Sequence, residues 1–139
     1  MLVAGRNTDP AAAVSVLLVD DHEMIRTLWK EMLTESLPNV RFMEASNGAH
    51  AVWIAHETPP DVILMDLNMP VMSGIDAVKW MKEDDVMRRI PVIAVTGLQF
   101  SPEEMISAGC AGCLAKPLSS DQLVREVSRV LGRPLPHTP

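Results

Sequence analysis

The sequence of 139 residues has no excess of positive charge, because 18 aspartates and glutamates outnumber 12 lysines and arginines. The resulting net charge of -6 gives no general attraction to nucleic acid phosphates or to anionic lipids. No apolar run approaches the about 20 residues of a membrane span, and the start lacks the basic and apolar parts of a secretory signal. We therefore expect a cytoplasmic protein that contacts neither membranes nor, by itself, nucleic acid.

Cysteine is also scarce, since Cys110 and Cys113 are the only two and form a C-x-x-C. Zinc would need two further ligands, and a thioredoxin-like pair should open a helix after a strand. This pair instead follows a helix end at Gly109 and precedes an apolar segment. We interpret both cysteines as structural.

Apolar runs of strand length alternate with stretches that are long enough for a crossover helix. The expected strands are 14–19, 40–44, 62–65, 91–95 and 112–115. A hydrophobic content of 47% and a length of 139 residues fit one domain with a real core. The pattern therefore predicts a single α/β domain over residues 14–131.

Helical patterns fill the gaps between the expected strands. In the first helix, an apolar stripe should face the sheet; it comprises Ile25, Leu28, Trp29, Met32 and Leu33. Weaker patterns predict helices over 47–57 and 74–82.

The last two helices carry capping signals. Ser101, Pro102 and Glu104 should begin the fourth, and Ser119 with Gln122 the fifth.

The two ends of the chain differ in composition from the expected domain. Residues 1–13 are Ala-rich at their end and predict a flexible N-terminal segment. Residues 132–139 contain three prolines, which predict a helix stop followed by a disordered end or the first part of a linker.

Three carboxylates end two of the apolar runs: Asp20 and Asp21 follow the first, and Asp66 ends the third. Uninterrupted apolar runs are typical of parallel strands buried on both faces, and ligands bind where such strands end. Each aspartate alone could simply cap the following helix. Three together would repel one another unless a cation lay among them, and oxygen ligands without histidine or cysteine favour magnesium.

Two further polar residues end two of the three remaining runs. Thr96 follows the fourth run and Lys116 the fifth, so a hydroxyl and an ammonium should share the strand-end rim with the three acids. Such groups can donate hydrogen bonds and supply positive charge to an incoming phosphoryl group.

With these residues in this order, the sequence resembles the receiver domain of two-component response regulators over nearly the whole chain. The matching residues are Asp20, Asp21, Asp66, Met69, Pro70, Met72, Gly74, Thr96, Lys116 and Pro117. The resemblance implies a flavodoxin-like, doubly wound, three-layer α/β/α fold. It has a five-stranded parallel sheet in the order 2-1-3-4-5 and five helices.

The resemblance also implies that Asp66 accepts a phosphoryl group from a histidine kinase or a histidine phosphotransfer protein. Asp21, Asp66 and the backbone carbonyl of Asn68 would hold Mg²⁺ directly, while Asp20 would act largely through water. The aspartyl phosphate would be hydrolysed by water, so the modification is a temporary switch.

The remaining motif residues would serve the phosphoryl group and the switch. Lys116 would contact the phosphoryl oxygens, Thr96 would swing toward them, and Pro117 would follow a cis peptide bond. The sequence departs from the family at Cys113, where an aromatic switch residue usually stands, and at Gly97, where alanine is commoner. We therefore expect intact phosphoryl chemistry and altered transmission to an unknown downstream protein.

The interpretation that the sequence favours is a single-domain receiver that signals by protein contacts and catalyses no reaction beyond its own phosphorylation and dephosphorylation. It could instead be a receiver from a hybrid kinase or a larger regulator. A magnesium-dependent phosphatase that forms an aspartyl phosphate would need an acid where Asn68 stands. A flavin-binding module would need a phosphate loop rich in hydroxyl and glycine residues, not the sequence DDHEM.

Overall fold

The computed structural model describes residues 13–37, 39–69, 72–97 and 99–133. Within them, strands and helices alternate along the chain as the sequence predicts. The strands are β1 (Val14–Val19), β2 (Val40–Ala45), β3 (Val62–Asp66), β4 (Val92–Thr96) and β5 (Gly112–Ala115). The helices are α1 (Glu23–Ser36), α2 (Gly48–Glu57), α3 (Gly74–Lys82), the short 3-10 helix η1 (Met87–Arg89), α4 (Pro102–Ala108) and α5 (Ser120–Leu131).

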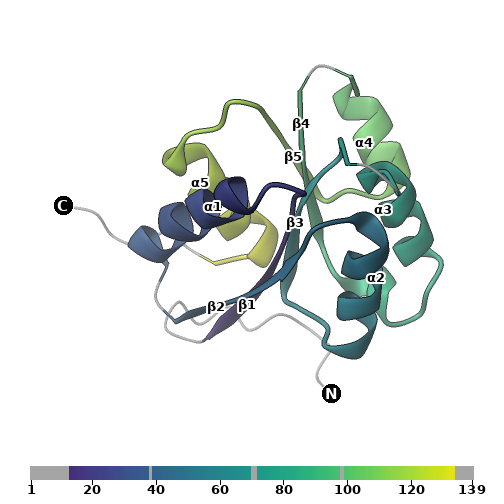
Figure 1. Cartoon of the computed structure of the whole chain (residues 1–139), viewed down its shortest axis with the longest axis horizontal. Coiled ribbons are helices and arrows are strands. Elements are labelled where there is room, and N and C mark those ends of the chain that lie inside the picture. The colour runs from purple at the N-terminus through teal and green to yellow at the C-terminus, as the bar shows by residue number, and fades with distance from the viewer. Residues whose placement is uncertain (1–12, 38, 70–71, 98, 134–139) are drawn as a thin grey trace.

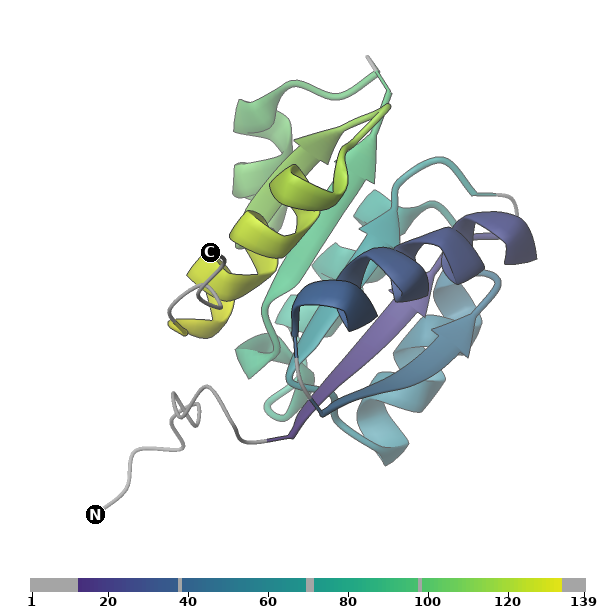
Figure 2. The same cartoon turned by 90° about the vertical axis from the view of Figure 1, so that its left-hand side faces the viewer.

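The strands form one parallel sheet in the order β2-β1-β3-β4-β5, which confirms the predicted flavodoxin-like topology. Helices α1 and α5 cover one face of the sheet, and α2, α3 and α4 cover the other (Figures 1 and 2). Each face has its own apolar core. Strands β3 and β4 are buried along their whole length, as expected for strands that are covered on both faces.

The predicted capping signals begin the last two helices. The Ser101 hydroxyl accepts a hydrogen bond from the Glu104 N–H, and the Glu104 carboxylate accepts one from the Ser101 N–H. Ser119 and Gln122 make the same reciprocal pair at the start of α5. Gly109 ends α4 in the left-handed conformation, with a φ of 112°.

The apolar stripe of α1 faces the sheet only in part. Trp29 and Leu33 are buried, and Ile25 and Met32 are half-buried. Leu28, however, is 44% exposed, so the prediction that it packs against the sheet was wrong. Helix α1 lies beside α5 on this face of the sheet (Figure 2), and Leu28 lines the open space between α1 and the loop after β5 instead of entering the core.

Most of the two terminal segments lies outside the described residues. These cover only residue 13 of the segment 1–13, and only Gly132 and Arg133 of the segment 132–139. Gly132 ends α5 with a φ of 69°. In the described part of the chain, no helix has the length and apolar character needed to cross a membrane.

Candidate functional site

The parallel strands bring the predicted polar residues to one rim of the sheet. Asp66 in β3 is in register with Val95 of β4, and Thr96 is in register with Ala115 at the end of β5. Asp20 follows β1 directly, and Lys116 follows β5. Asp20 is completely buried, and Asp66 and Thr96 are each only 2% exposed. Polar groups that are this enclosed usually have hydrogen-bond partners, so any without one in the protein indicates room for a bound ion or ligand.

Asp66 is held by groups from two neighbouring loops. The ammonium nitrogen of Lys116 lies 3.2 Å from Asp66 Oδ1. The Asn68 N–H donates a hydrogen bond of 3.0 Å to the same oxygen. Both contacts leave the carboxylate facing the rim, and a carboxylate is a group that can act as a nucleophile.

Asp20 has an unsatisfied buried oxygen. Its Oδ1 accepts a hydrogen bond of 2.7 Å from the His22 N–H, whereas Oδ2 is buried and has no hydrogen-bond partner among the described residues. Burial raises the pKa of the Asp20 carboxyl, and the neighbouring Asp66 carboxylate raises it further. A cation beside Asp20 and Asp66 would offset both the burial of the Asp20 carboxylate and its repulsion by Asp66. These residues therefore fit a hard divalent ion such as Mg²⁺.

The remaining predicted ligands lie at the mouth of the site. The side chain of Asp21 is 29% exposed and turns toward the ring of His22. Asn68 follows β3, and its side-chain amide donates a hydrogen bond of 2.8 Å to Gln99. Sequence reasoning missed His22 and Gln99, because neither residue carries a motif signal and both enter the site only through loop geometry.

Thr96 and Lys116 are joined through the backbone. The Lys116 N–H donates a hydrogen bond of 2.8 Å to the Thr96 carbonyl oxygen. The Thr96 hydroxyl is buried without a hydrogen-bond partner among the described residues. The Lys116–Pro117 peptide is cis, as the resemblance implied. An unsatisfied hydroxyl and an ammonium at one rim of the sheet suit an incoming anion.

Two glycines leave room at the rim. A Cβ at Gly74 would lie 2.5 Å from the Asp66 carbonyl oxygen, so α3 can begin this close to β3 only at a glycine. A Cβ at Gly97 would have only Gln99 Oε1 nearby among the described residues, at 3.4 Å, so the backbone after Thr96 is open on this side. Pro70 of the matching motif lies outside the described residues.

Cys113 occupies the expected switch position in β5. It is half-buried and packs at the margin of the core on the α2, α3 and α4 side. Both cysteines are free, and burial raises the pKa of the Cys110 thiol to about 11. A thiol with that pKa is protonated at neutral pH, which agrees with a structural role.

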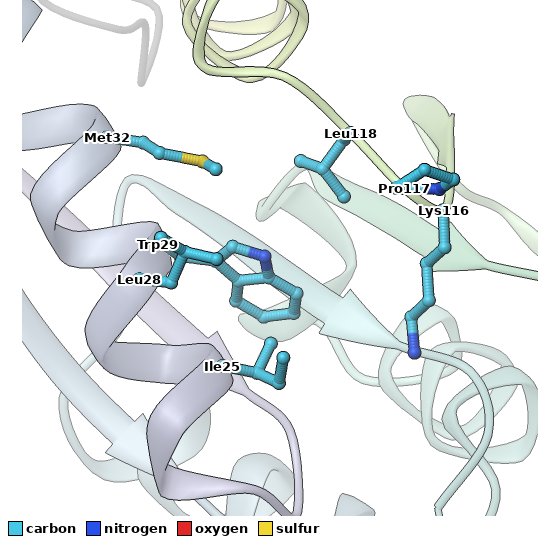
Figure 3. Close-up of a pocket in the computed structure, with 7 residues that line it drawn as sticks. All are labelled: Ile25, Leu28, Trp29, Met32, Lys116, Pro117 and Leu118. Carbon is cyan, nitrogen blue, oxygen red and sulfur yellow. The ribbon is translucent and has the colours of Figure 1, made fainter.

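An apolar groove with a volume of about 450 Å³ lies beside the rim, between α1 and the loop after β5. It is lined by Ile25, Leu28, Trp29, Met32, Lys116, Pro117 and Leu118, which face one another across the opening (Figure 3). Lys116 therefore borders both the groove and the Asp66 site. This groove connects the exposed edge of α1 to the rim that carries Asp66.

A family model described as the response regulator receiver domain matches residues 16–128. The chain belongs to this family. The receiver is 35% identical over 120 residues to the polar-differentiation response regulator DivK of Brucella anthropi, a match that covers 85% of this chain and 96% of that protein.

Solved receiver structures agree with this assignment. The receiver domain of sensor histidine kinase PA1611 from Pseudomonas aeruginosa is 33% identical with a TM-score of 0.78, and the match covers 87% of this chain and 99% of that one. That structure has a magnesium ion coordinated in its active site cleft. Chemotaxis response regulator CheY4 of Vibrio cholerae is 30% identical with a TM-score of 0.76, covering 86% of this receiver and 99% of that chain.

Magnesium binding should depend unequally on the two acids after β1. We predict that Asp21→Ala weakens Mg²⁺ binding more than Asp20→Ala does, because the resemblance assigns Asp21 as the direct ligand and Asp20 as a ligand through water. Calorimetric titration of the unphosphorylated protein measures both effects. Equal losses in the two variants, or no loss in either, would contradict these roles.

Proposed function

We propose that this receiver accepts a phosphoryl group on Asp66 from a histidine kinase or a histidine phosphotransfer protein, with Mg²⁺ as the cofactor. The observation that carries the proposal is the enclosed Asp66 carboxylate, which contacts the Lys116 ammonium and the Asn68 N–H beside the unsatisfied Asp20 oxygen. Asp21, Asp66 and the Asn68 carbonyl are the expected metal ligands, and magnesium would neutralise charge on the transferring group.

The chemistry follows from these contacts. An oxygen of Asp66 attacks the donor phosphorus, the bond from phosphorus to the donor's histidine nitrogen breaks, and the imidazole leaves with that electron pair. Lys116 stabilises negative charge on the phosphoryl oxygens, and the Thr96 hydroxyl donates a hydrogen bond to one of them. Water later attacks the phosphorus, which releases inorganic phosphate and restores the carboxylate. The protein acts on no other substrate.

A test of the site does not require the natural donor. Incubation with acetyl phosphate and Mg²⁺ should raise the mass of the intact protein by one phosphoryl group, and chelation of the metal should prevent it. No mass change under these conditions would contradict the proposal.

We also propose that the chain acts as a single-domain receiver in the cytoplasm, where kinases have access to ATP. The match to DivK, which covers 96% of that response regulator, supports an action as a receiver. The similarity to the PA1611 receiver keeps a hybrid kinase or larger regulator as the alternative, and the full reading frame distinguishes the two. An aspartyl-phosphate phosphatase is disfavoured because Asn68, an amide already bonded to Gln99, stands where that mechanism needs an acid.

Kinase docking is proposed for the groove beside α1. Its lining is mostly apolar and extends to Lys116 at the rim. The lining includes Leu28, which is 44% exposed. An apolar helix that carries the donor histidine would cover this groove while presenting its phosphoryl group to Asp66. A downstream target should bind the phosphorylated form more tightly than the unphosphorylated form.

Transmission through β5 should be weak in this receiver. Thr96 movement vacates space that an aromatic ring would normally fill, and the thiol of Cys113 has little to move. In addition, the Cys113 N–H donates a hydrogen bond of 3.2 Å to Glu126, and Arg129 donates one of 2.9 Å to the Ala111 carbonyl. These two contacts attach α5 to the edge strand.

We therefore predict that beryllofluoride, a mimic of the phosphoryl group, shifts amide signals over residues 105–116 much less than those beside Asp66. Amide chemical shifts with and without beryllofluoride measure the difference. Shifts of comparable size in the two regions would refute the prediction. Cys113→Tyr should enlarge the response of that face if the ring fits.

A further inference from the structure

Two tryptophans lie on the surface of the sheet face opposite the α1 groove. Trp53 of α2 is 62% exposed and Trp80 of α3 is 54% exposed, whereas the third tryptophan, Trp29, is buried in the core under α1. One exposed apolar side chain is ordinary on a protein surface. Two exposed tryptophans on adjacent helices indicate a contact surface, because the residues that dominate binding at interfaces are enriched in tryptophan.

Trp80 borders the seam between α2 and α3. The two helices lie side by side (Figure 1). A Cβ at Gly48 would lie 3.2 Å from the Cβ of Ala77, so these two residues mark where α2 meets α3. Trp80 is three residues after Ala77 and therefore lies on the same side of α3.

Trp53 borders the same seam from α2. The N–H groups of Met87 and Val86 donate hydrogen bonds to Asp84 Oδ2 and lower the pKa of that carboxyl, and the charge on His56 lowers it further. His56 of α2 is therefore close to Asp84, which lies just after α3. Since Trp53 is three residues before His56, it shares the face of α2 that borders α3.

A small opening beside Trp80 is lined by acids. Its volume is about 230 Å³, and its lining consists of Trp80, Glu83 and Asp84. The Lys82 ammonium donates instead to two backbone carbonyl oxygens of the segment after α3, and no ion pair among the described residues involves Glu83. An indole beside two carboxylates fits a lysine or arginine side chain, which the carboxylates attract and the face of the ring binds by a cation–π contact.

The charge of this surface also decides among the classes of partner. A second copy of the chain would bring the same acids to the contact, and the acids repel nucleic acid phosphates and anionic lipids. A basic protein segment is attracted, and its apolar side chains can cover the two indoles.

We propose that Trp53, Trp80, Glu83 and Asp84, here called the tryptophan seam, bind a basic amphipathic segment of a partner protein. A lysine or arginine side chain of that segment lies over Trp80 beside the two carboxylates. The tryptophan seam and the α1 groove lie on opposite faces of the sheet, so this partner and a phosphoryl donor can bind at the same time. The proposal does not rest on phosphorylation of Asp66.

The test uses the full chain without Mg²⁺ or a phosphoryl donor. The probe is a short synthetic helical peptide with leucine on one face and arginine on the other, and its control carries uncharged citrulline in place of each arginine. The indole N–H signals of the three tryptophans report binding by NMR. The arginine peptide should shift the signals of Trp53 and Trp80 and leave that of Trp29 unchanged. The citrulline peptide should bind at least about threefold more weakly.

Two variants locate the site. Trp80→Ala and Glu83→Gln should each lower the affinity for the arginine peptide at least about threefold, because the first removes the ring and the second removes a charge. Both residues are exposed, so the fold should remain intact. The matched controls are Ile106→Ala and Glu103→Gln, which change exposed residues of α4 and should bind like wild type.

Three results would overturn the proposal: equal affinity of wild type for the two peptides, equal affinity of wild type and Trp80→Ala for the arginine peptide, or no shift of the two exposed indoles. Dimerisation of wild type that Trp80→Ala abolishes would assign the tryptophan seam to a second copy instead. Binding to phosphatidylcholine vesicles with the same dependence on Trp80 would assign it to a membrane.

Discussion

Asp66→Asn should abolish phosphorylation by acetyl phosphate in the presence of Mg²⁺. The asparagine amide is not a nucleophilic carboxylate, and no other described acid combines a lysine contact with a hydrogen bond from a neighbouring backbone N–H. Intact-protein mass spectrometry should show one added phosphoryl group in wild type and none in the variant. Labelling of Asp66→Asn at the wild-type rate would assign the phosphoryl group to another residue.

The matched control is Asp85→Asn. Asp85 has a side chain that is 93% exposed and pairs only loosely with Arg88, at 3.7 Å. This variant undergoes the same chemical change outside the site and should be phosphorylated like wild type.

Stability to heat supplies a second check on the site. Asp66→Asn removes a like charge beside the buried Asp20, so without metal the variant should be at least as stable to heat as wild type.

The acids of the site could be predicted because their positions follow from strand burial. Asp66 and Asp20 end continuous apolar runs, and parallel strands of similar length must end at one rim. The same reasoning predicted that Thr96 and Lys116 lie at this rim. β3 and β4 each end one residue later than predicted, at Asp66 and Thr96, because a polar residue ends an apolar strand. β2 also extends one residue further, to Ala45, and β4 begins one residue later, at Val92.

His22 and Leu28 show where this logic ends. The side-chain position of His22 depends on the turn between β1 and α1, which brings Nδ1 between two carboxylates and has no periodic signal. The apolar spacing of α1 includes Leu28, but its exposure depends on where the loop after β5 lies across from it. Both depend on loop geometry that packing patterns within one element do not specify.

Leu28→Glu should lower phosphotransfer from the cognate kinase or phosphotransfer protein at least tenfold, because hot-spot substitutions at interfaces typically cost about 2 kcal/mol or more. A carboxylate beside the groove would be desolvated by an apolar partner helix without a compensating charge. Phosphorylation by acetyl phosphate should stay at the wild-type rate, since that small donor does not need the groove. The cognate donor is found first by profiling the kinases of the source organism.

Ile106→Glu is the matched control, because Ile106 is an aliphatic residue of α4 that is 65% exposed, on the opposite side of the sheet. Both substitutions change exposed side chains, so neither should unfold the protein. If the donor helix binds in the groove, Leu28→Glu should lower phosphotransfer from the cognate donor but not from acetyl phosphate. Ile106→Glu should lower neither. Equal transfer from the kinase to both variants would remove the groove from the docking surface, and a loss with acetyl phosphate as well would mean that Leu28 supports the Asp66 site itself.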